Sequence, residues 1–227
     1  MKKPVVDYRE FRFSKLNDPK FRHLKLLGCW IGYFSLYFLT ENLIPVSACH
    51  EVHCVLDDMI PFTEQFVIFY YSWYLLCVLS LLYYLLYDIP RFRQLQIFIG
   101  ITQAVAMFVY IVYPTIQLLR PAVMPRDNFF TRVIGFLYAF DTPTGVSPSL
   151  HVAYTIGILS VFFKDPGISK KAKAALLIWG VLICLSTAFI KQHSVVDIFT
   201  ALPLGLLAEI LVFGRSYYLP KIREKKA

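Results

Sequence analysis

Long apolar runs constrain this chain more than any other feature of its sequence. A helix of about 20 residues covers about 30 Å of hydrocarbon, and inside lipid such a helix satisfies its own backbone hydrogen bonds. Six runs approach that length and carry few charges: residues 24–44, 64–87, 95–115, 149–163, 173–191 and 195–213. The sequence therefore predicts an all-α, polytopic integral membrane protein with six transmembrane helices.

The composition agrees with a single membrane domain. Of the 227 residues, 57% are hydrophobic and 17% are charged, whereas about 25% of a soluble domain is charged. We expect the membrane domain to cover residues 23–214, between a basic N-terminal arm (1–22) and a basic tail (215–227). The fourth run is short for a full span, so we expect it to begin inside the protein, where neighbouring helices shield its polar first turn.

The distribution of basic residues predicts the orientation. The net charge is +8, and Lys and Arg gather in the arm, the tail and the second and fourth connections between runs. The opposite connections hold only Arg120, Arg126, Arg132 and Lys191. By the positive-inside rule both termini are cytoplasmic, in a plasma, cytoplasmic or internal membrane. The basic surplus then reflects topology and contact with the bilayer, and no nucleic-acid partner is expected.

Chemistry-bearing residues collect at the opposite, non-cytoplasmic side. His193 and Asp197 are four residues apart, which places them on one helical face, where the carboxylate can accept one imidazole N–H. His151 stands at a predicted helix start, where backbone N–H groups and the helix dipole favour an anion such as phosphate. Two histidines with ordinary pKa values of about 6.5 can serve as base and acid at neutral pH. These residues predict phosphoryl transfer.

Three short motifs carry a family resemblance. They are Arg120-Pro121, Pro148-Ser149-Leu150-His151, and Ser186 followed by His193 and Asp197. In this order, on one predicted face, they resemble the signatures of the type 2 phosphatidic acid phosphatase (PAP2) superfamily. The resemblance covers roughly residues 113–200 together with the six-helix layout.

The resemblance implies a PAP2-like helical bundle and specific roles. His193 would be the nucleophile and Asp197 its orienting partner. His151 would be the acid for the leaving group, and Ser149 and Arg120 would bind phosphate. Alternatives remain open for single residues: Ser149 could simply cap a helix, Arg120 could anchor at headgroup level, and Asp141 fits either a turn or the lining of the site.

Two positions depart from the pattern of the phosphatases. Tyr113 stands where the family has a lysine, and Thr187 stands where it has an arginine. A residue other than arginine at the second position is similar to the sphingolipid-synthase branch, which includes inositol phosphorylceramide and sphingomyelin synthases and moves a phospho-headgroup between lipids. Lys191 and Arg126 are candidates to supply the missing charge.

The first outward connection contains two cysteines and two histidines in the segment Cys49-His50-Glu51-Val52-His53-Cys54. Outside the cytoplasm, Cys49 and Cys54 could form a small disulfide. Free thiols are a second interpretation. A zinc site using both histidines is a third, although four ligands within six residues would strain the usual tetrahedral geometry.

We therefore expect a lipid-phosphate phosphatase that acts at the outer leaflet through a phosphohistidine and needs no cofactor. The substrate is a lipid phosphate or a phosphodiester lipid, and the oligomeric state stays open. A phosphotransferase that delivers the headgroup to a lipid alcohol is the alternative. A non-catalytic lipid transporter or scaffold on the same fold is a second alternative.

Overall fold

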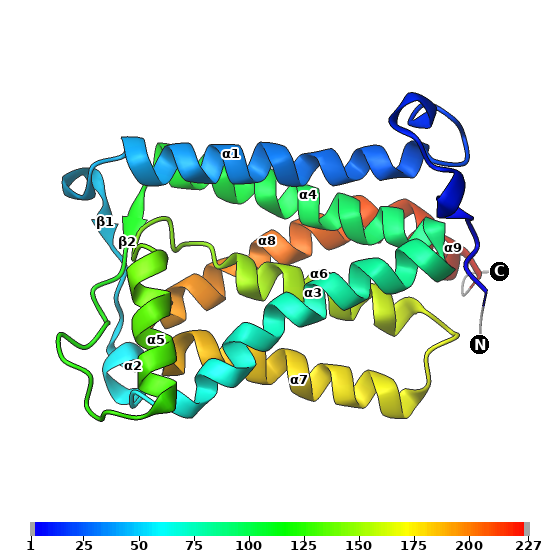
Figure 1. The fold of residues 1–227 in the computed structure, drawn as a ribbon. Coiled ribbons are helices and arrows are strands. Elements are labelled where there is room, and N and C mark those ends of the chain that lie inside the picture. Colours follow the sequence, from blue (N-terminus) through cyan, green and yellow to red (C-terminus); the bar gives the residue numbers. More distant parts are fainter. Residues whose placement is uncertain (1–2, 225–227) are drawn as a thin grey trace.

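A computed structural model describes residues 3–224 and shows an all-α protein. The long helices run side by side (Figure 1): α1 (Gly28–Leu43), α3 (Val67–Tyr87), α4 (Ile89–Val112), α6 (Leu150–Lys164), α7 (Lys170–Phe189) and α8 (Val195–Phe213). Each of the six apolar runs thus contains one long helix. Shorter helices are α2 (Val55–Met59), α5 (Phe129–Phe140) and α9 (Leu219–Glu224).

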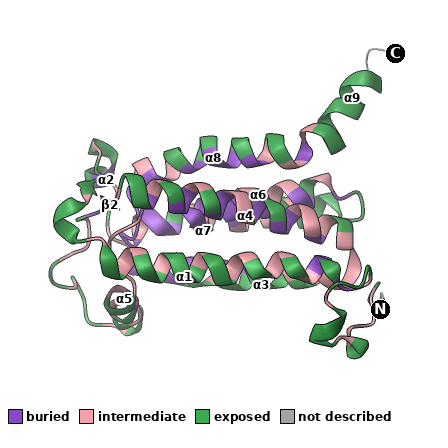
Figure 2. Cartoon of the chain, turned by 90° about the horizontal axis from the view of Figure 1, so that it is seen from above, coloured by how far each residue is buried: buried purple, intermediate pink, exposed green. Residues whose placement is uncertain are grey.

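Four helical stretches are long and apolar enough to cross a membrane: Glu64–Tyr87, Ile89–Val112, Lys170–Phe189 and Val195–Glu224. The remaining long helices, α1 with 16 residues and α6 with 15, are shorter. Exposed residues nevertheless run along the outer faces of α1, α3 and α8 (Figure 2), and many of them are large and apolar. Helix α1 has no buried residue at all, and Phe38 is 65% exposed. Continuous exposed apolar surface of this kind indicates an apolar environment.

Two boundaries differ from the predicted ones. Helix α4 begins six residues before the predicted start at residue 95, because the Asp88 side chain accepts the backbone N–H of Arg91 and Pro90 fits the first turn. Arg91 and Arg93 therefore lie in the helix. The segment 116–148, in which the apolar runs predict no helix, also contains α5. Asn128 caps its first turn by accepting the N–H of Thr131.

The loop ends are joined at one end of the bundle. Strand β1 (His50–Glu51) pairs in parallel with β2 (Thr115–Ile116), and His50 lies opposite Thr115. Helices α2 and α5 lie at the same end, while the N-terminal turns and α9 lie at the other (Figure 1). The segments that contain β1, β2 and α5 are thereby held together around the starts of α6 and α8.

Helix α6 is the centre of the core and packs against α3, α4, α7 and α8. Its close approach to α4 depends on Gly157, because a Cβ there would lie 2.5 Å from Cδ1 of Phe98. Phe98 is fully buried and has no free space to move into. The glycine is therefore a packing requirement.

We expect Gly157→Ala to lower the free energy of unfolding by about 1–3 kcal/mol, the usual effect of overpacking a core. The matched control is Gly100→Ala on α4, where an added Cβ meets nothing within 4 Å. Thermal unfolding in detergent micelles measures both. Equal melting temperatures for the two variants would contradict the packing argument.

Candidate functional site

The turn between α7 and α8 presents His193. The carbonyl of Thr187 accepts the backbone N–H groups of Gln192 (2.9 Å) and His193 (3.0 Å), which closes the end of α7. Lys191 has a φ of 56°, in the left-handed region that non-glycine residues rarely adopt. The chain therefore reverses within a few residues and leaves His193 directly before Ser194, the N-cap of α8.

His193 lies between a carboxylate and a second imidazole. Its Nδ1 is 3.1 Å from Oδ2 of Asp197, and its Nε2 is 3.4 Å from Nδ1 of His151. His193 precedes α8 rather than lying on it, so the contact with Asp197 arises from the helix cap and not from a shared helical face. The same Oδ2 accepts the backbone N–H of Ser194 at 3.0 Å. Asp197 is fully buried, and its Oδ1 has no hydrogen-bond partner in the described structure.

Ser149 lies at the N-cap of α6, yet its side chain makes no capping hydrogen bond. Its hydroxyl is buried and has no partner among residues 3–224. The Ser149 backbone N–H donates to the carbonyl of Asp197 at 3.1 Å, which ties the start of α6 to the start of α8. The hydroxyl is thus free to bind a ligand at a helix N-terminus, a location that favours anions.

Aromatic rings enclose His151. The ring centroids of Tyr70 and Trp73, both on α3, lie 4.5 and 4.2 Å from the imidazole centroid. Nε2 of His151 is buried without a hydrogen-bond partner in the described residues. The packing fixes the imidazole plane and leaves Nδ1 facing His193.

Arg120 and Asp141 lie near this pair of histidines. The Arg120 guanidinium stacks 4.4 Å over the Tyr138 ring and donates to the Tyr138 carbonyl at 3.3 Å, while its Nε has no partner in the described structure. Burial lowers the pKa of Arg120, and the nearby charge of Asp141 opposes that effect. Burial raises the pKa of Asp141, and the charges of His193 and Arg120 act against it.

Asp141 is bound by side chains from distant segments. Tyr37 of α1 donates to its Oδ1 at 3.0 Å, and Nε2 of Gln192 donates to its Oδ2 at 2.8 Å. These bonds connect α1 and the His193 turn to the C-cap of α5. Asp141 therefore lines the edge of the site in addition to ending a helix.

The two candidate replacement cations are engaged elsewhere. The Lys191 ammonium donates to the backbone carbonyls of Asp57 (2.7 Å) and Ile60 (2.6 Å) at the end of α2. Arg126 donates to both carboxylate oxygens of Glu64, at 2.8 and 3.0 Å. Lys191 and Arg126 therefore have other partners, whereas Arg120 lies beside Tyr138 and close to Asp141.

The positions that depart from the family pattern also have local roles. The Tyr113 ring stacks on the His50 ring with centroids 4.1 Å apart. Thr187 is fully buried, and its hydroxyl donates to the carbonyl of Cys184 within α7. Neither side chain supplies a positive charge.

Cys49 and Cys54, in the connection between α1 and α3, are free thiols. The interpretation of a Cys49–Cys54 disulfide is therefore corrected by the structure, in which Cys54 instead caps α2. The two histidines also have other partners, since His50 stacks on Tyr113 and His53 pairs with Asp58 at 2.9 Å. Within residues 3–224 no three His, Cys, Asp or Glu side chains gather as a metal site would require.

Alkylation of the unfolded protein without reductant should modify both Cys49 and Cys54, because both thiols are free. Peptide mass spectrometry of a reduced and an unreduced sample measures this. A pair of cysteines that reacts only after reduction would show that the disulfide forms.

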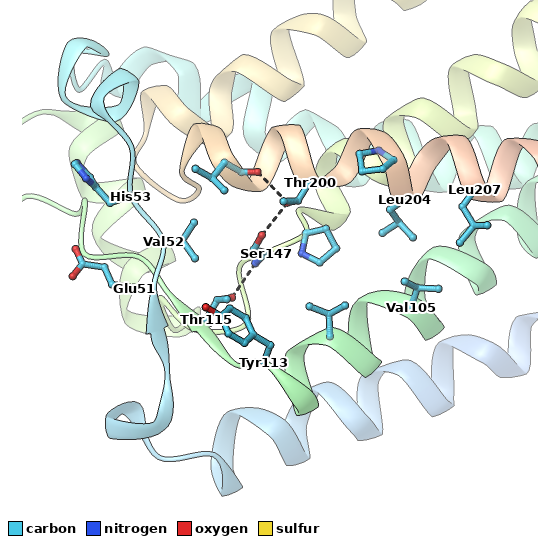
Figure 3. Close-up of a pocket in the computed structure, with 14 residues that line it drawn as sticks. Glu51, Val52, His53, Val105, Tyr113, Thr115, Ser147, Thr200, Leu204 and Leu207 are labelled. Atoms are coloured by element: carbon cyan, nitrogen blue, oxygen red, sulfur yellow. Dashed lines mark hydrogen bonds between the residues drawn. The ribbon is translucent and has the colours of Figure 1, made fainter.

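A groove lies behind the site, between α4 and α8 (Figure 3). It has a volume of about 620 Å³, within the usual range for ligand pockets. Val105 on α4 faces Leu204 and Leu207 on α8, so its inner part is apolar. Its outer end is polar, where the Ser147 N–H donates to the Thr115 hydroxyl at 3.1 Å and the Ser147 and Thr200 hydroxyls are 2.9 Å apart.

The sequence analysis missed three residues around the site. Asp57 accepts hydrogen bonds from Ser194 and Val195, and Gln192 and Tyr37 hold Asp141. The acidic pair Asp57-Asp58, in the connection between α1 and α3, is a sequence signal for the first. Tyr37 lies within an apolar run and carried no signal of this role.

Comparison with models of known protein families, with curated proteins and with solved structures gave no match.

Proposed function

We propose that this protein is a membrane-embedded lipid-phosphate phosphatase that acts through a phosphohistidine. The observation that carries the proposal is the alignment of Asp197, His193 and His151 beside the unpartnered Ser149 hydroxyl. The resemblance of these motifs to the type 2 phosphatidic acid phosphatases supports the same reaction. So does the rule that ionisable residues among apolar helices usually serve a function.

The proposed chemistry follows from the hydrogen bonds. Asp197 accepts the Nδ1–H of His193 and leaves the lone pair of Nε2 to attack phosphorus. The bond from phosphorus to the lipid oxygen then breaks, and that oxygen takes a proton from His151. Water attacks the phosphohistidine, gives a proton to His151, and releases phosphate from His193.

Charge on the phosphate oxygens needs stabilisation during both steps. The Ser149 hydroxyl and the N-terminal backbone N–H groups of α6 would serve as neutral donors, and Arg120 as the cation. The phosphate would enter between the two imidazoles, whose nitrogens are 3.4 Å apart. That entry requires the rings to separate when substrate binds.

A bilayer setting completes the proposal. All six long helices would span the membrane, both termini would be cytoplasmic, and the site would open to the other side, as the basic residues indicate. The groove between α4 and α8 supports a lipid substrate, because its apolar inner part suits a hydrocarbon chain and its polar end adjoins Ser147 and Pro148, directly before Ser149.

A second candidate function is phosphotransfer from a phosphodiester lipid to a lipid alcohol. The engagement of Lys191 with carbonyls of α2 and of Arg126 with Glu64 favours it. A diester carries one negative charge fewer than a monoester and needs fewer cations at the site.

We expect His193→Ala to abolish turnover of lipid phosphates and His151→Ala to slow formation of the intermediate. Asp197→Asn should lower kcat by about 10⁴-fold, as for other carboxylates that orient a catalytic histidine. His50→Ala is the matched control, since the His50 side chain is exposed and lies outside the lining of the groove. The measurement is phosphate release in proteoliposomes, and normal turnover by His193→Ala would refute the mechanism.

Paired monoester and diester lipids with identical chains separate the two functions. If the protein is a phosphatase, monoesters release phosphate, and Arg120→Ala lowers that rate about 10–100-fold through the loss of a charge-assisted hydrogen bond. Arg126→Ala should leave it unchanged, because Arg126 is bound to Glu64. Headgroup transfer from the diester to an added lipid alcohol, without monoester hydrolysis, would establish the transferase instead. Turnover of neither lipid would favour a transporter or scaffold.

A further inference from the structure

The short helix α2 contacts the candidate site through one buried carboxylate. Asp57 is 2% exposed, although it lies in a connection between two long helices and stands next to the exposed Asp58. Its Oδ1 accepts the backbone N–H of Val195 at 2.8 Å. Its Oδ2 accepts the Ser194 hydroxyl at 2.6 Å and the Cys54 backbone N–H at 2.8 Å.

These bonds divide the donors at the start of α8 between two carboxylates. The first N–H groups of a helix have no partner within the helix. Asp57 takes the Val195 N–H and the Ser194 hydroxyl, while Asp197 takes the Ser194 N–H. The Ser194 hydroxyl oxygen also accepts the N–H of Val196 at 3.1 Å, which fixes its orientation. Because Asp57 accepts the Ser194 hydroxyl and the Val195 N–H, the Asp197 carboxylate does not have to accept them. It can therefore face His193.

The same helix holds the chain on the other side of His193. The Lys191 ammonium binds the carbonyls of Asp57 and Ile60, at the C-terminal end of α2, where helix carbonyls lack a partner within the helix. These two bonds also stabilise the left-handed backbone conformation at Lys191. His193 thus lies between two residues, Lys191 and Ser194, that are both bound to α2.

The charge state of Asp57 suits this arrangement. Burial opposes ionisation of the carboxyl, but hydrogen bonds from Ser194 and from the backbone N–H groups of Val195 and Cys54 outweigh it and lower the pKa below its usual value. Its neighbour Asp58 differs, because its side chain is 65% exposed and pairs with His53. Replacing Asp58 therefore serves as a control for replacing Asp57, because the two acids are adjacent but only Asp57 is buried.

We propose that α2 positions the nucleophile, with Asp57 as the positioning residue for His193. Asp57 does not touch the substrate. It fixes the first turn of α8, and through that turn the distance and angle between His193 and Asp197. The effect on turnover rests on the proposed function; the effect on the conformation of His193 does not.

The experiment compares Asp57→Asn, Asp57→Ala and Ser194→Ala with the control Asp58→Asn. The first readout is kcat and KM for a lipid phosphate in proteoliposomes. A displacement of about 1 Å at a catalytic group costs about 10²-fold in rate, so we expect kcat to fall to that extent in Asp57→Ala. KM should change little, because the phosphate-binding groups stay in place. Asp57→Asn keeps one acceptor oxygen, so its kcat should lie between those of Asp57→Ala and the wild type.

The second readout needs no activity. Diethyl pyrocarbonate modifies accessible imidazole nitrogens, and peptide mass spectrometry gives the rate at His193. We expect that rate to rise several-fold in the Asp57 and Ser194 variants and to stay unchanged in Asp58→Asn. The rate at His53 is an internal standard in every variant except the control.

Two results would overturn the proposal. One is turnover that falls only in proportion to the folded fraction, measured by thermal unfolding, which would show a purely structural role. The other is a His193 modification rate equal to that of Asp58→Asn. If Asp57→Ala fails to fold, Asp57→Asn and Ser194→Ala decide the question, since each removes fewer hydrogen bonds. A wild type without turnover would reject the proposed function, and the modification rate would still test the positioning.

Discussion

Asp197 connects the two helix starts on which the candidate site is built. Its carboxylate accepts Nδ1–H of His193 and the N–H of Ser194, while its own carbonyl accepts the N–H of Ser149. One residue therefore aligns the start of α8, the nucleophile of the proposed reaction and the segment that leads to His151. Because Asp197 is fully buried, its replacement by an apolar residue would leave the donors of His193 and Ser194 without this partner, and each such donor costs about 1–3 kcal/mol.

Around Asp197 some buried polar groups have hydrogen-bond partners and others have none in the described structure. Structural donors such as the Val195 N–H and the Lys191 ammonium have partners at 2.8 Å or less. The Ser149 hydroxyl, Nε of Arg120 and Oδ1 of Asp197 are buried and have none among the described residues. Buried polar atoms in proteins are normally paired. These three atoms belong to residues that the proposed reaction uses as donors and acceptors, and this coincidence supports a binding site there.

Much of the fold followed from the sequence, because apolar runs of membrane length have few alternatives to a helix. Long helices lie in all six predicted runs, and the site motifs stand at the predicted end of two of them. Helix α4 begins before residue 95 because the cap by Asp88 keeps Arg91 and Arg93 helical, and these charges end an apolar run without ending the helix. The partners of Lys191 and Arg126 lie 131 and 62 residues away in the chain. No local pattern encodes such contacts, so the sequence could propose these cations for the site but could not exclude other partners.

The contact between α2 and α8 also has a consequence for how the protein is made. Asp57 and its partners Ser194 and Val195 are 137 and 138 residues apart, so the carboxylate is synthesised long before the donors that neutralise its burial. Contacts of such high sequence separation form late, since the intervening loop must be closed first. We therefore expect α2 to stay unattached until α8, the last long helix, packs into the bundle. The turn that carries His193 would then form in the same step that completes the fold.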